Sequence, residues 1–569
     1  MAFRRLILAA ALSFAVPSLL LAQAENVPAT DPVYTFLKRM EVRGILDRYS
    51  DAILPLSRRE IGEFLLTVDR NRDRLTESEK DWENRYLDQF RYEVSGNTEG
   101  TNSLISTSAE GMTSGTGRFF ADTQKYLYAT RDTNLTAFVN GLLTFDARGI
   151  SGDALGSAHA EFIQGGGRVR GTIYGHLGYY FQAVNAQFWG SRELLARDPA
   201  IGQIQTIGQT NIQNFDAAEG HVRYDAGIVS AEVGTERVLW GTGYDQKMIM
   251  SDNVRPFPFL RADFRYGSIR YTFIHAWLLG LPRPWTDFVS ADSALKIKGP
   301  SIADKYVAAH RLQFTFPRLF DVAFNEMVVY SNRSPDLAYF VPLMLLESAQ
   351  RARGDRDNGL WSFDLQTHFT PGIELTGTIL FDDLHLTDFF KNRYYNKNAY
   401  QLGFFLTDPF MFRNTSLMVE WTRVQPFVFS HDYSIEDTYT SNGAPLGPRI
   451  GPNSDSWLIR GDVFPAKRTT LSLRYFYGRH GDNVYDVSGN LIQNVGGDIE
   501  QGHRLSDPIT VEFLAGNLVK TQTVQLMATY EPVYQIWIDG WYEYDRITTE
   551  ATGAVTSNGT FGVRVRTEF

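Results

Sequence analysis

The last nine residues, Phe561-Gly562-Val563-Arg564-Val565-Arg566-Thr567-Glu568-Phe569, alternate between two kinds of side chain. Phe561, Val563, Val565 and Phe569 fall at odd positions, and the even positions hold glycine, arginine and glutamate. Because successive side chains of a strand point to opposite faces, one face of this segment suits hydrocarbon and the other suits water. The chain is therefore predicted to end in a two-faced β-strand.

This ending resembles the C-terminal insertion signal of bacterial outer-membrane β-barrels, whose last strand closes the barrel and ends in Phe. The resemblance implies that Phe561, Val563, Val565 and Phe569 belong to such a signal. It also implies two partners, the barrel-insertion machinery and outer-membrane lipid. An ordinary edge strand of a soluble sheet would show the same alternation, so that alternative stays open at this point.

The first 24 residues have the organisation of a secretory signal peptide. Arg4 and Arg5 precede an apolar run from Leu6 to Leu21, and Ala22-Gln23-Ala24 forms a small-residue cleavage site. We therefore expect export through a cleaved signal peptide and a mature protein that begins near Glu25.

The rest of the chain contains no helical membrane span, since no window approaches the roughly 20 apolar residues that a spanning helix needs. A closed barrel is the other structure that satisfies every backbone group in lipid. Aromatic residues make up 14% of the chain, yet its mean hydropathy is negative. A barrel wall that alternates lipid-facing and lumen-facing residues has this composition.

Charge and cysteine content narrow the functional classes. The chain has no cysteine, so no disulfide framework holds it. Its net charge is −10, which argues against nucleic acid as a partner.

Residues 25–95 are predicted to form a small α-helical bundle, a plug or cap on the periplasmic side. Asp31 and Pro32 open the first helix, and Gly44 ends it. Ser57 to Glu60 and Thr76 to Glu79 are capping-box patterns, each followed by apolar residues at helical spacing. Residues 96–117, rich in Gly, Ser and Thr, are interpreted as a linker.

Residues 118–569 are predicted to form an antiparallel transmembrane β-barrel, so the fold class is all-β with an N-terminal helical bundle. Two-faced strands such as 169–181 alternate with turn signals such as Thr370-Pro371-Gly372. Dividing about 450 residues by roughly 25 per strand and connection gives 16 to 18 strands. The polar insertions 431–456 and 478–508 are expected to be long extracellular loops.

A central motif carries the most specific resemblance. Glu232 to Gly243 contains Gly-Thr-Glu-Arg-Val-Leu-Trp-Gly-Thr-Gly, and Ser251 and Phe257-Pro258 follow. Together with Pro-Val-Tyr-Thr-Phe-Leu-Lys-Arg-Met-Glu-Val-Arg-Gly near the N-terminus, Pro-Leu-Ser-Arg-Arg-Glu-Ile at residues 55–61 and the terminal Phe, this order of parts resembles the capsule assembly Wzi family.

The family resemblance implies an outer-membrane barrel of about 18 strands that acts as a lectin. Such a protein would bind capsular or related exopolysaccharide, attach it to the cell surface and support capsule assembly. Export-machinery proteins are a further candidate partner. A porin-like channel for small solutes is the alternative, because a polar inner face is compatible with both functions.

Three residues are hypothesised to bind glycan, Arg237, Trp240 and Tyr339, since proteins often hold sugars with aromatic faces and charged hydrogen bonds. A lumenal salt bridge is an equally good interpretation of Arg237, and packing is the stronger interpretation around Tyr339. Irregular backbone around the central motif should fold inside the barrel mouth. The residues given a structural role there and in the segment after Ser334 are Gly241, Gly243, Ser251, Phe257, Pro258 and Pro342.

Catalysis has little support in the sequence, and we expect no enzyme activity, cofactor or metal. Asp382, Asp383 and His385 cluster in one short segment, where carboxylates could act in acid–base chemistry or bind Ca²⁺. Zinc-protease, nucleophile-elbow and phosphate-loop motifs are absent from the sequence.

Overall fold

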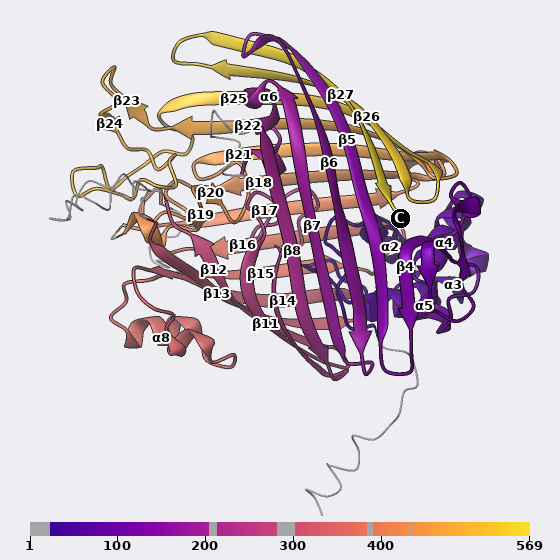
Figure 1. Ribbon diagram of the computed structural model, residues 1–569. Helices are drawn as coiled ribbons and strands as arrows, with labels where there is room; N and C mark the ends of the chain where they lie inside the picture. The colour runs from indigo at the N-terminus through magenta and orange to yellow at the C-terminus, as the bar shows by residue number, and fades with distance from the viewer. Residues whose placement is uncertain (1–22, 204–212, 282–301, 384–390, 433) are drawn as a thin grey trace, which may run out of the picture.

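The computed structural model describes residues 23–203, 213–281, 302–383, 391–432 and 434–569. Within these ranges eighteen antiparallel strands form a closed barrel, which confirms the predicted fold class (Figure 1). The predicted signal peptide, apart from its last two residues, lies outside the described residues. The barrel strands are β5 (Thr136–Gly152), β6 (Gly156–Ile173), β7 (Leu177–Gly190), β8 (Asn214–Asp225), β9 (Val229–Glu236), β11 (Phe257–Tyr266), β12 (Ile269–Leu279), β13 (Asp304–Phe316), β14 (Phe320–Ser331), β15 (Asn358–Thr367), β16 (Ile373–Phe381), β17 (Asn398–Thr407), β18 (Thr415–Val424), β21 (Ser454–Ala466), β22 (Thr469–Asp482), β25 (Asn517–Val533), β26 (Ile536–Thr549) and β27 (Ala554–Glu568).

The last strand closes the barrel by pairing with the first. β27 runs antiparallel to β5, and Phe561 lies opposite Gly149. A Cβ on Gly149 would come within 2.6 Å of the Phe561 ring, so this position has room only for glycine. The predicted alternation is confirmed, because Phe561 and Val563 are exposed on the outside while Arg564 binds Asp146 inside.

The two ends of the barrel differ in their connections. Turns such as 317–319, 368–372 and 534–535 are short and lie at the end that also holds the C-terminus and the N-terminal helices (Figure 1). The opposite end carries the long connections, including 332–357, 425–453 and 483–516. Short turns at one end and long loops at the other are usual in outer-membrane barrels, and the N-terminal helices lie at the end with the short turns.

The N-terminal helices begin where the capping patterns indicate. Ser57 and Thr76 each accept from the backbone N–H three residues later, and Glu60 and Glu79 complete the two capping boxes. The helices in this segment are α2 (Val33–Val42), α3 (Arg58–Asp69), α4 (Glu77–Gln89) and α5 (Arg91–Ser95). Among the described residues, none of the helices is long enough and apolar enough to span a membrane.

The expected linker 96–117 has regular structure of its own. It contains β2 (Asn102–Thr107) and β3 (Thr113–Ser114), and β2 pairs in parallel with β4 (Lys125–Arg131). β4 in turn pairs with the start of β5. Ser and Thr residues of the predicted linker therefore lie in short strands beside the closing seam, where β2 pairs with both β3 and β4.

The inside of the barrel is filled by chain segments. β10 (Leu239–Trp240) pairs there with β1 (Ile53–Leu54), and Trp240 donates to Asn325 of β14 at 2.9 Å. Buried apolar residues of the segment after β10 pack against the connection between β18 and β21 and against inward-facing wall residues, among them Met248, Ile249, Met250, Val307, Met327, Val428, Phe429, Tyr439 and Leu446.

A buried ion network joins helix α2 to the wall. Nζ of Lys38 lies 2.7 Å from Glu374 on β16, 3.0 Å from Glu41 and 3.3 Å from Asp51. Burial alone lowers the pKa of Lys38, but these carboxylates outweigh it and raise the pKa well above its usual value. The ammonium is therefore the positive centre that lets three carboxylates approach one another inside the barrel.

Replacing Lys38 should therefore weaken the docking of the helices. Lys38→Met leaves Glu374 buried without its cation and leaves Glu41 with His368 as its remaining cation, at an expected cost of about 3–5 kcal/mol in the free energy of unfolding. Urea unfolding in lipid vesicles measures this loss. Lys80→Met, which removes a surface pair with Glu77, is the matched control and should leave the midpoint unchanged. Equal midpoints for the two variants would contradict the role given to Lys38.

Candidate functional site

A pocket of about 560 Å³ opens at the loop end of the barrel. This volume lies within the range of about 300–1,000 Å³ that small-ligand pockets usually have. Helix α8 (Leu346–Ala352), the connection after it, the ends of β15 and β16 and two outer loops form its walls. Its lining residues are Glu347, Gln350, Arg351, Asp355, Asp357, Asn358, Gly359, Trp361, Phe381, Asp382, Asp383, Tyr394, Tyr395, Lys397, His431 and Asp432.

Aromatic side chains make up one part of this outer pocket. Trp361 and Phe381 are direct partners across β15 and β16. Tyr394 and Tyr395 come from the connection between β16 and β17 and contact each other edge to face, with ring centroids 5.3 Å apart. The ring of Tyr394 also stacks on His503 at 3.5 Å, which fixes it against the connection between β22 and β25.

The charged part of the outer pocket is organised around Lys397. Its ammonium lies 3.2 Å from Asp383 and 3.6 Å from Asp432 and donates to the carbonyl of Ser430. Burial raises the pKa of the Asp382 carboxyl to about 8, although Lys397 acts in the opposite direction. At neutral pH the Asp382 side chain is thus mainly protonated and can donate a hydrogen bond.

The wall beneath α8 holds pocket groups in place through hydrogen bonds. Tyr339 donates to Asp357 at 2.6 Å, and Arg333 binds the same carboxylate. Gln350 of α8 donates to the carbonyl of Asp357 at 2.6 Å. Asp357 is therefore fixed from three sides at the edge of the pocket.

A family profile described as capsule assembly protein Wzi matches residues 166–552, which is more than half of the chain. The chain belongs to the capsule assembly protein Wzi family. Among curated protein sequences, none matches it.

One solved structure gives the same fold. The chain is similar to Wzi of Escherichia coli, described as a carbohydrate-binding β-barrel of the outer membrane involved in group 1 capsule assembly, with 12% identity over 95% of this chain and 99% of that chain and a TM-score of 0.55. At this identity the similarity shows a common fold alone. Two Pseudomonas aeruginosa structures also match: the outer membrane protein OprD, with 10% identity over 76% of this chain and 93% of that chain and a TM-score of 0.41, and OccK5, with 9% identity over 76% of this chain and 98% of that chain and a TM-score of 0.40.

The three residues hypothesised from the sequence to bind glycan lie in different places in this Wzi-family chain. Trp240 is fully buried in the lumen, and Tyr339 is fully buried under the outer pocket. Arg237 is half-buried at the end of β9. The structure does not bring the three together, and neither aromatic ring offers a face to a ligand. Tyr339 orients Asp357 at the edge of the outer pocket, and Trp240 packs in the lumenal core.

The residues of the central motif shape the segment that enters the lumen. Gly241 has a φ of +131° and donates to the carbonyl of Ala52, and a Cβ on it would lie 3.1 Å from the Met248 nitrogen. A Cβ on Gly243 would lie 2.0 Å from the carbonyl of Gln246. Ser251 and Phe257 are buried, whereas Pro258 and Pro342 are exposed.

Sequence reasoning missed most of the outer pocket. Of its lining residues, it named Asp382 and Asp383 alone. His385, which it grouped with them, lies outside the described residues. The one usable signal is the pair Tyr394-Tyr395 in a polar connection next to Lys397. Its partners Trp361, Asp357 and Gln350 come from other segments, and only the folded barrel edge brings them together.

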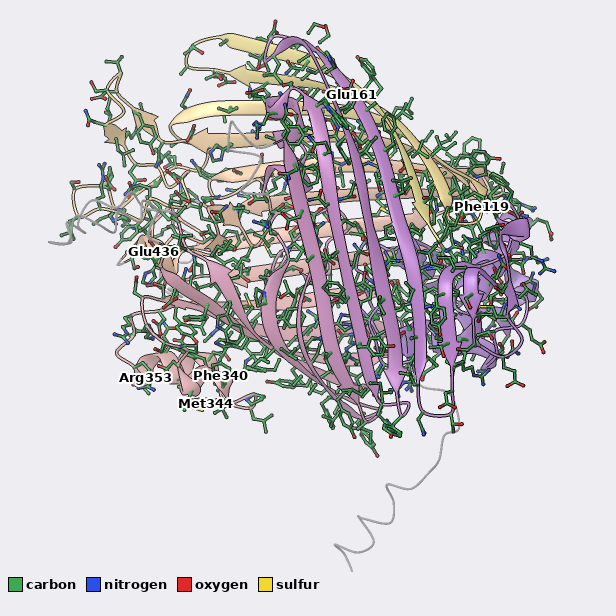
Figure 2. All side chains as sticks on the ribbon, in the orientation of Figure 1. Phe119, Glu161, Phe340, Met344, Arg353 and Glu436 are labelled. Carbon is green, nitrogen blue, oxygen red and sulfur yellow. The ribbon has the colours of Figure 1, made fainter. Side chains whose placement is uncertain are left out.

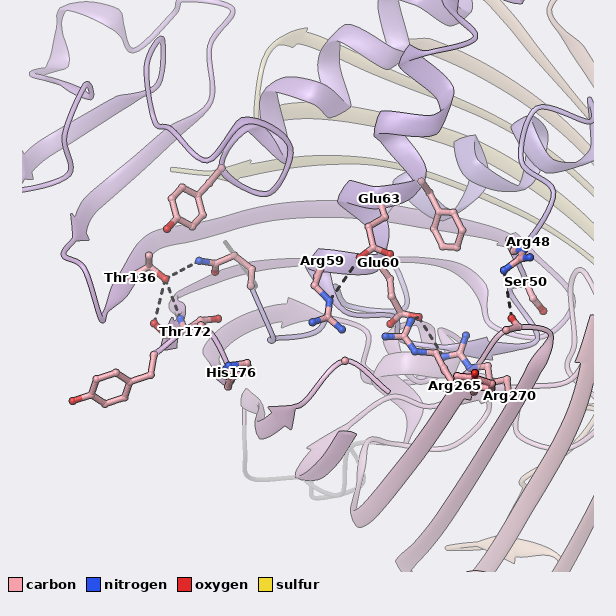
Figure 3. Close-up of a pocket in the computed structure, with 18 of the residues that line it drawn as sticks. Arg48, Ser50, Arg59, Glu60, Glu63, Thr136, Thr172, His176, Arg265 and Arg270 are labelled. Carbon is pink, nitrogen blue, oxygen red and sulfur yellow. Dashed lines mark hydrogen bonds and ion pairs between the residues drawn. The ribbon is translucent and has the colours of Figure 1, made fainter. Parts of the chain in front are cut away.

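A second pocket, of about 740 Å³, lies between the N-terminal helices and the short turns (Figure 3). Glu60 of α3 pairs there with Arg265, and Arg270 lies 3.6 Å from the same carboxylate. Arg59 of α3 lies 2.8 Å from Asp225 at the end of β8, and Arg48 donates to the carbonyl of Gly267 in a strand turn. These contacts join the helices to the wall, so this pocket is a docking junction of the N-terminal segment.

Two buried clusters bring a histidine and two glutamates within metal-binding distance of one another, His221–Glu232–Glu236 and Glu41–His368–Glu374. The backbone N–H of Asn26 donates to Nε2 of His221, so the ring proton is on Nδ1, which faces Glu236 at 3.2 Å. His368 lies in the turn between β15 and β16. Burial lowers its pKa, but Asp321 and Glu41 outweigh burial and raise the pKa to about 10. Both rings thus face the carboxylates with N–H groups, an arrangement that favours hydrogen bonding at His221 and ion pairing at His368 over metal binding.

The protonation of Asp382 predicts a pH dependence of the outer pocket. The neutral carboxyl accepts from the backbone N–H of Phe429, and the raised pKa means that its stabilising contribution is complete below about pH 4 and is lost as the pH rises through about 8. Asp382→Asn keeps a neutral acceptor at every pH. Hydrogen exchange of the segment around Phe429 should be equal in the two proteins at about pH 4. At about pH 9 exchange should be faster in the wild type than in the variant. Identical exchange at both pH values would contradict the assigned protonation.

Proposed function

We propose that the protein binds capsular or related exopolysaccharide in the outer pocket and attaches it to the cell surface. The observation that carries this proposal is the combination of Trp361, Tyr394 and Tyr395 with carboxylates, an amide and one lysine in a pocket at the loop end. Sugars present apolar ring faces and hydroxyl groups at once, and aromatic rings beside fixed hydrogen-bonding groups match both. Membership of the Wzi family and the carbohydrate binding described for the Escherichia coli relative support it.

We propose binding without turnover. A glycosidase needs two carboxyl groups, one on each side of the scissile bond, with room between them for the sugar. Here Asp383 and Asp432 are both directed at the ammonium of Lys397, and Asp382 is buried. On the other side of the pocket, Asp357 is held by Arg333 and Tyr339. Carboxyl groups that are engaged in ion pairs and hydrogen bonds support a cross-linked binding wall.

A porin-like channel has less support than attachment. The N-terminal segment, the chain after β10 and the connection between β18 and β21 all occupy the inside of the barrel. The helical segment 25–95 is proposed to act as a periplasmic plug. Its outer surface is also where export-machinery proteins would dock, and the terminal strand with Phe569 would serve the insertion machinery.

The proposed attachment is tested by the distribution of glycan between washed cells and medium. A deletion strain should make the same total glycan and shed most of it, and the wild-type gene should restore retention. A strain with Tyr395→Ala should retain less, with an expected loss of affinity of about 10-fold, or ~1.4 kcal/mol, as for truncation of a central aromatic contact.

The matched control is Tyr485→Ala, which removes an exposed tyrosine from the hairpin of β23 (Val484–Tyr485) and β24 (Leu491–Gln493), outside the pocket. It should retain glycan as the wild type does. If retention is unchanged in the deletion strain and solute uptake falls, the channel function replaces attachment. If both tyrosine variants shed glycan equally, the outer pocket is not the binding site.

A further inference from the structure

Residues 334–353, between β14 and β15, fold back over the outside of the barrel wall, and we refer to them as the lateral flap. Contacts of β14 show which of its residues face the lumen. Asn325 binds Trp240, and Met327 belongs to the lumenal core. The residues between and after them, Glu326, Val328 and Tyr330, therefore point outward. The flap packs on these outward residues (Figures 1 and 2).

The flap covers a pair of ionisable side chains on the outer side of the wall. Nε2 of His310 lies 2.7 Å from Glu326, and Tyr271 contacts the other ring nitrogen at 3.0 Å. The backbone N–H groups of Leu346 and Glu347 donate to the same glutamate at 2.9 and 2.7 Å. Glu326 is 2% exposed and His310 6% exposed. Ionisable groups on the lipid side of a barrel are costly, and here protein replaces lipid around them.

The outer surface of the flap is strongly apolar. Leu343 is 87% exposed and Leu337 is 78% exposed. The other large apolar side chains exposed on the same short segment are Val341, Met344 and Leu345. Such a patch is unusual on a surface that faces water, and it marks a site of interaction.

Three observations identify the partner as lipid hydrocarbon. The flap is continuous with the lipid-facing wall, because Glu326 beneath it is two residues from Phe324. Phe324 lines an apolar groove of about 870 Å³ on the outside of β13 to β18. At the exposed tip of the flap, Pro342 has no N–H, its carbonyl accepts from Tyr271, and the N–H of Met344 donates to the carbonyl of Val341. These features leave fewer unpaired backbone groups for hydrocarbon to meet.

The polar end of the flap lies toward the loop end of the barrel. Arg353 lies farther toward the loop end than Phe340 and Met344 (Figure 2). Arg351 and Arg353 are exposed and pair with Glu347 and Asp336. Apolar side chains toward the middle of the wall and charged side chains toward the loops match the order of acyl chains and headgroups in a leaflet.

We propose that the lateral flap is embedded in the outer leaflet, where Leu337, Val341, Leu343 and Leu345 contact the acyl chains of membrane lipid. Helix α8 of the flap also forms a wall of the outer pocket, so the lipid holds that wall at the level of the membrane surface.

The chain has no cysteine, which allows a single-site depth measurement on the full-length protein in lipid vesicles. A nitroxide label is attached to Leu343→Cys. We compare the collision rate of the label with oxygen, which concentrates in hydrocarbon, and its collision rate with a water-soluble nickel chelate. Val341→Cys gives an independent second position on the flap.

The two controls are Phe363→Cys on the exposed outer face of β15 and Val487→Cys at the fully exposed tip of the β23–β24 hairpin. We expect both flap labels to lose nickel accessibility as the Phe363 label does and to remain open to oxygen. Flap labels as accessible to nickel as the Val487 label would overturn the proposal.

Discussion

The barrel depends on one constraint, which is that every backbone N–H and C=O at membrane depth must have a partner within the protein. The seam between β27 and β5 satisfies this constraint for the first and last strands, and it does so at a close approach of Phe561 to Gly149. Since closure removes both sheet edges at once, the alternation of the last nine residues serves two purposes. Its apolar side chains meet lipid, and its arginines bind Asp146 and Asp539 inside.

Closure also creates an interior that must be filled or hydrated, and this chain fills it with its own segments. Polar wall residues bind the N-terminal helices through buried ion pairs such as that between Arg85 and Glu531. Nearer the loops, the wall turns apolar and packs on the segment after Trp240. The interior thus has an ionic half at the short-turn end and an apolar half at the loop end. Because both halves are filled, we propose that large molecules bind at the rim of the loop end.

The sequence predicts the parts of this protein that follow from local spacing. The capping boxes at Ser57 and Thr76 lie within four residues, so they could be identified without knowing what the helices pack against. The alternation from Phe561 to Phe569 depends only on the period of a strand. These local rules, with the strand count, account for most of the fold.

The candidate site could not be predicted in the same way, because it depends on contacts between distant segments. Trp240 and Tyr339 were attractive as aromatic residues in irregular stretches, but irregular backbone in a barrel folds inward or against the wall, and both rings became buried. The outer pocket joins Trp361 on a strand, Gln350 on α8 and Tyr395 in a loop. Their sequence spacing carries no periodic signal, and the folding of α8 and the loop after β16 onto the ends of β15 and β16 brings them together.

We propose that glycan occupies the outer pocket of a filled barrel. The most direct test is a crystal structure of the full-length protein with an oligosaccharide released from the polysaccharide of its own cells. We expect sugar density against Trp361 and Tyr395, with hydroxyl groups bound to Asp383 or Gln350. Sugar density inside the barrel, or bound to other loops with the outer pocket empty, would contradict it.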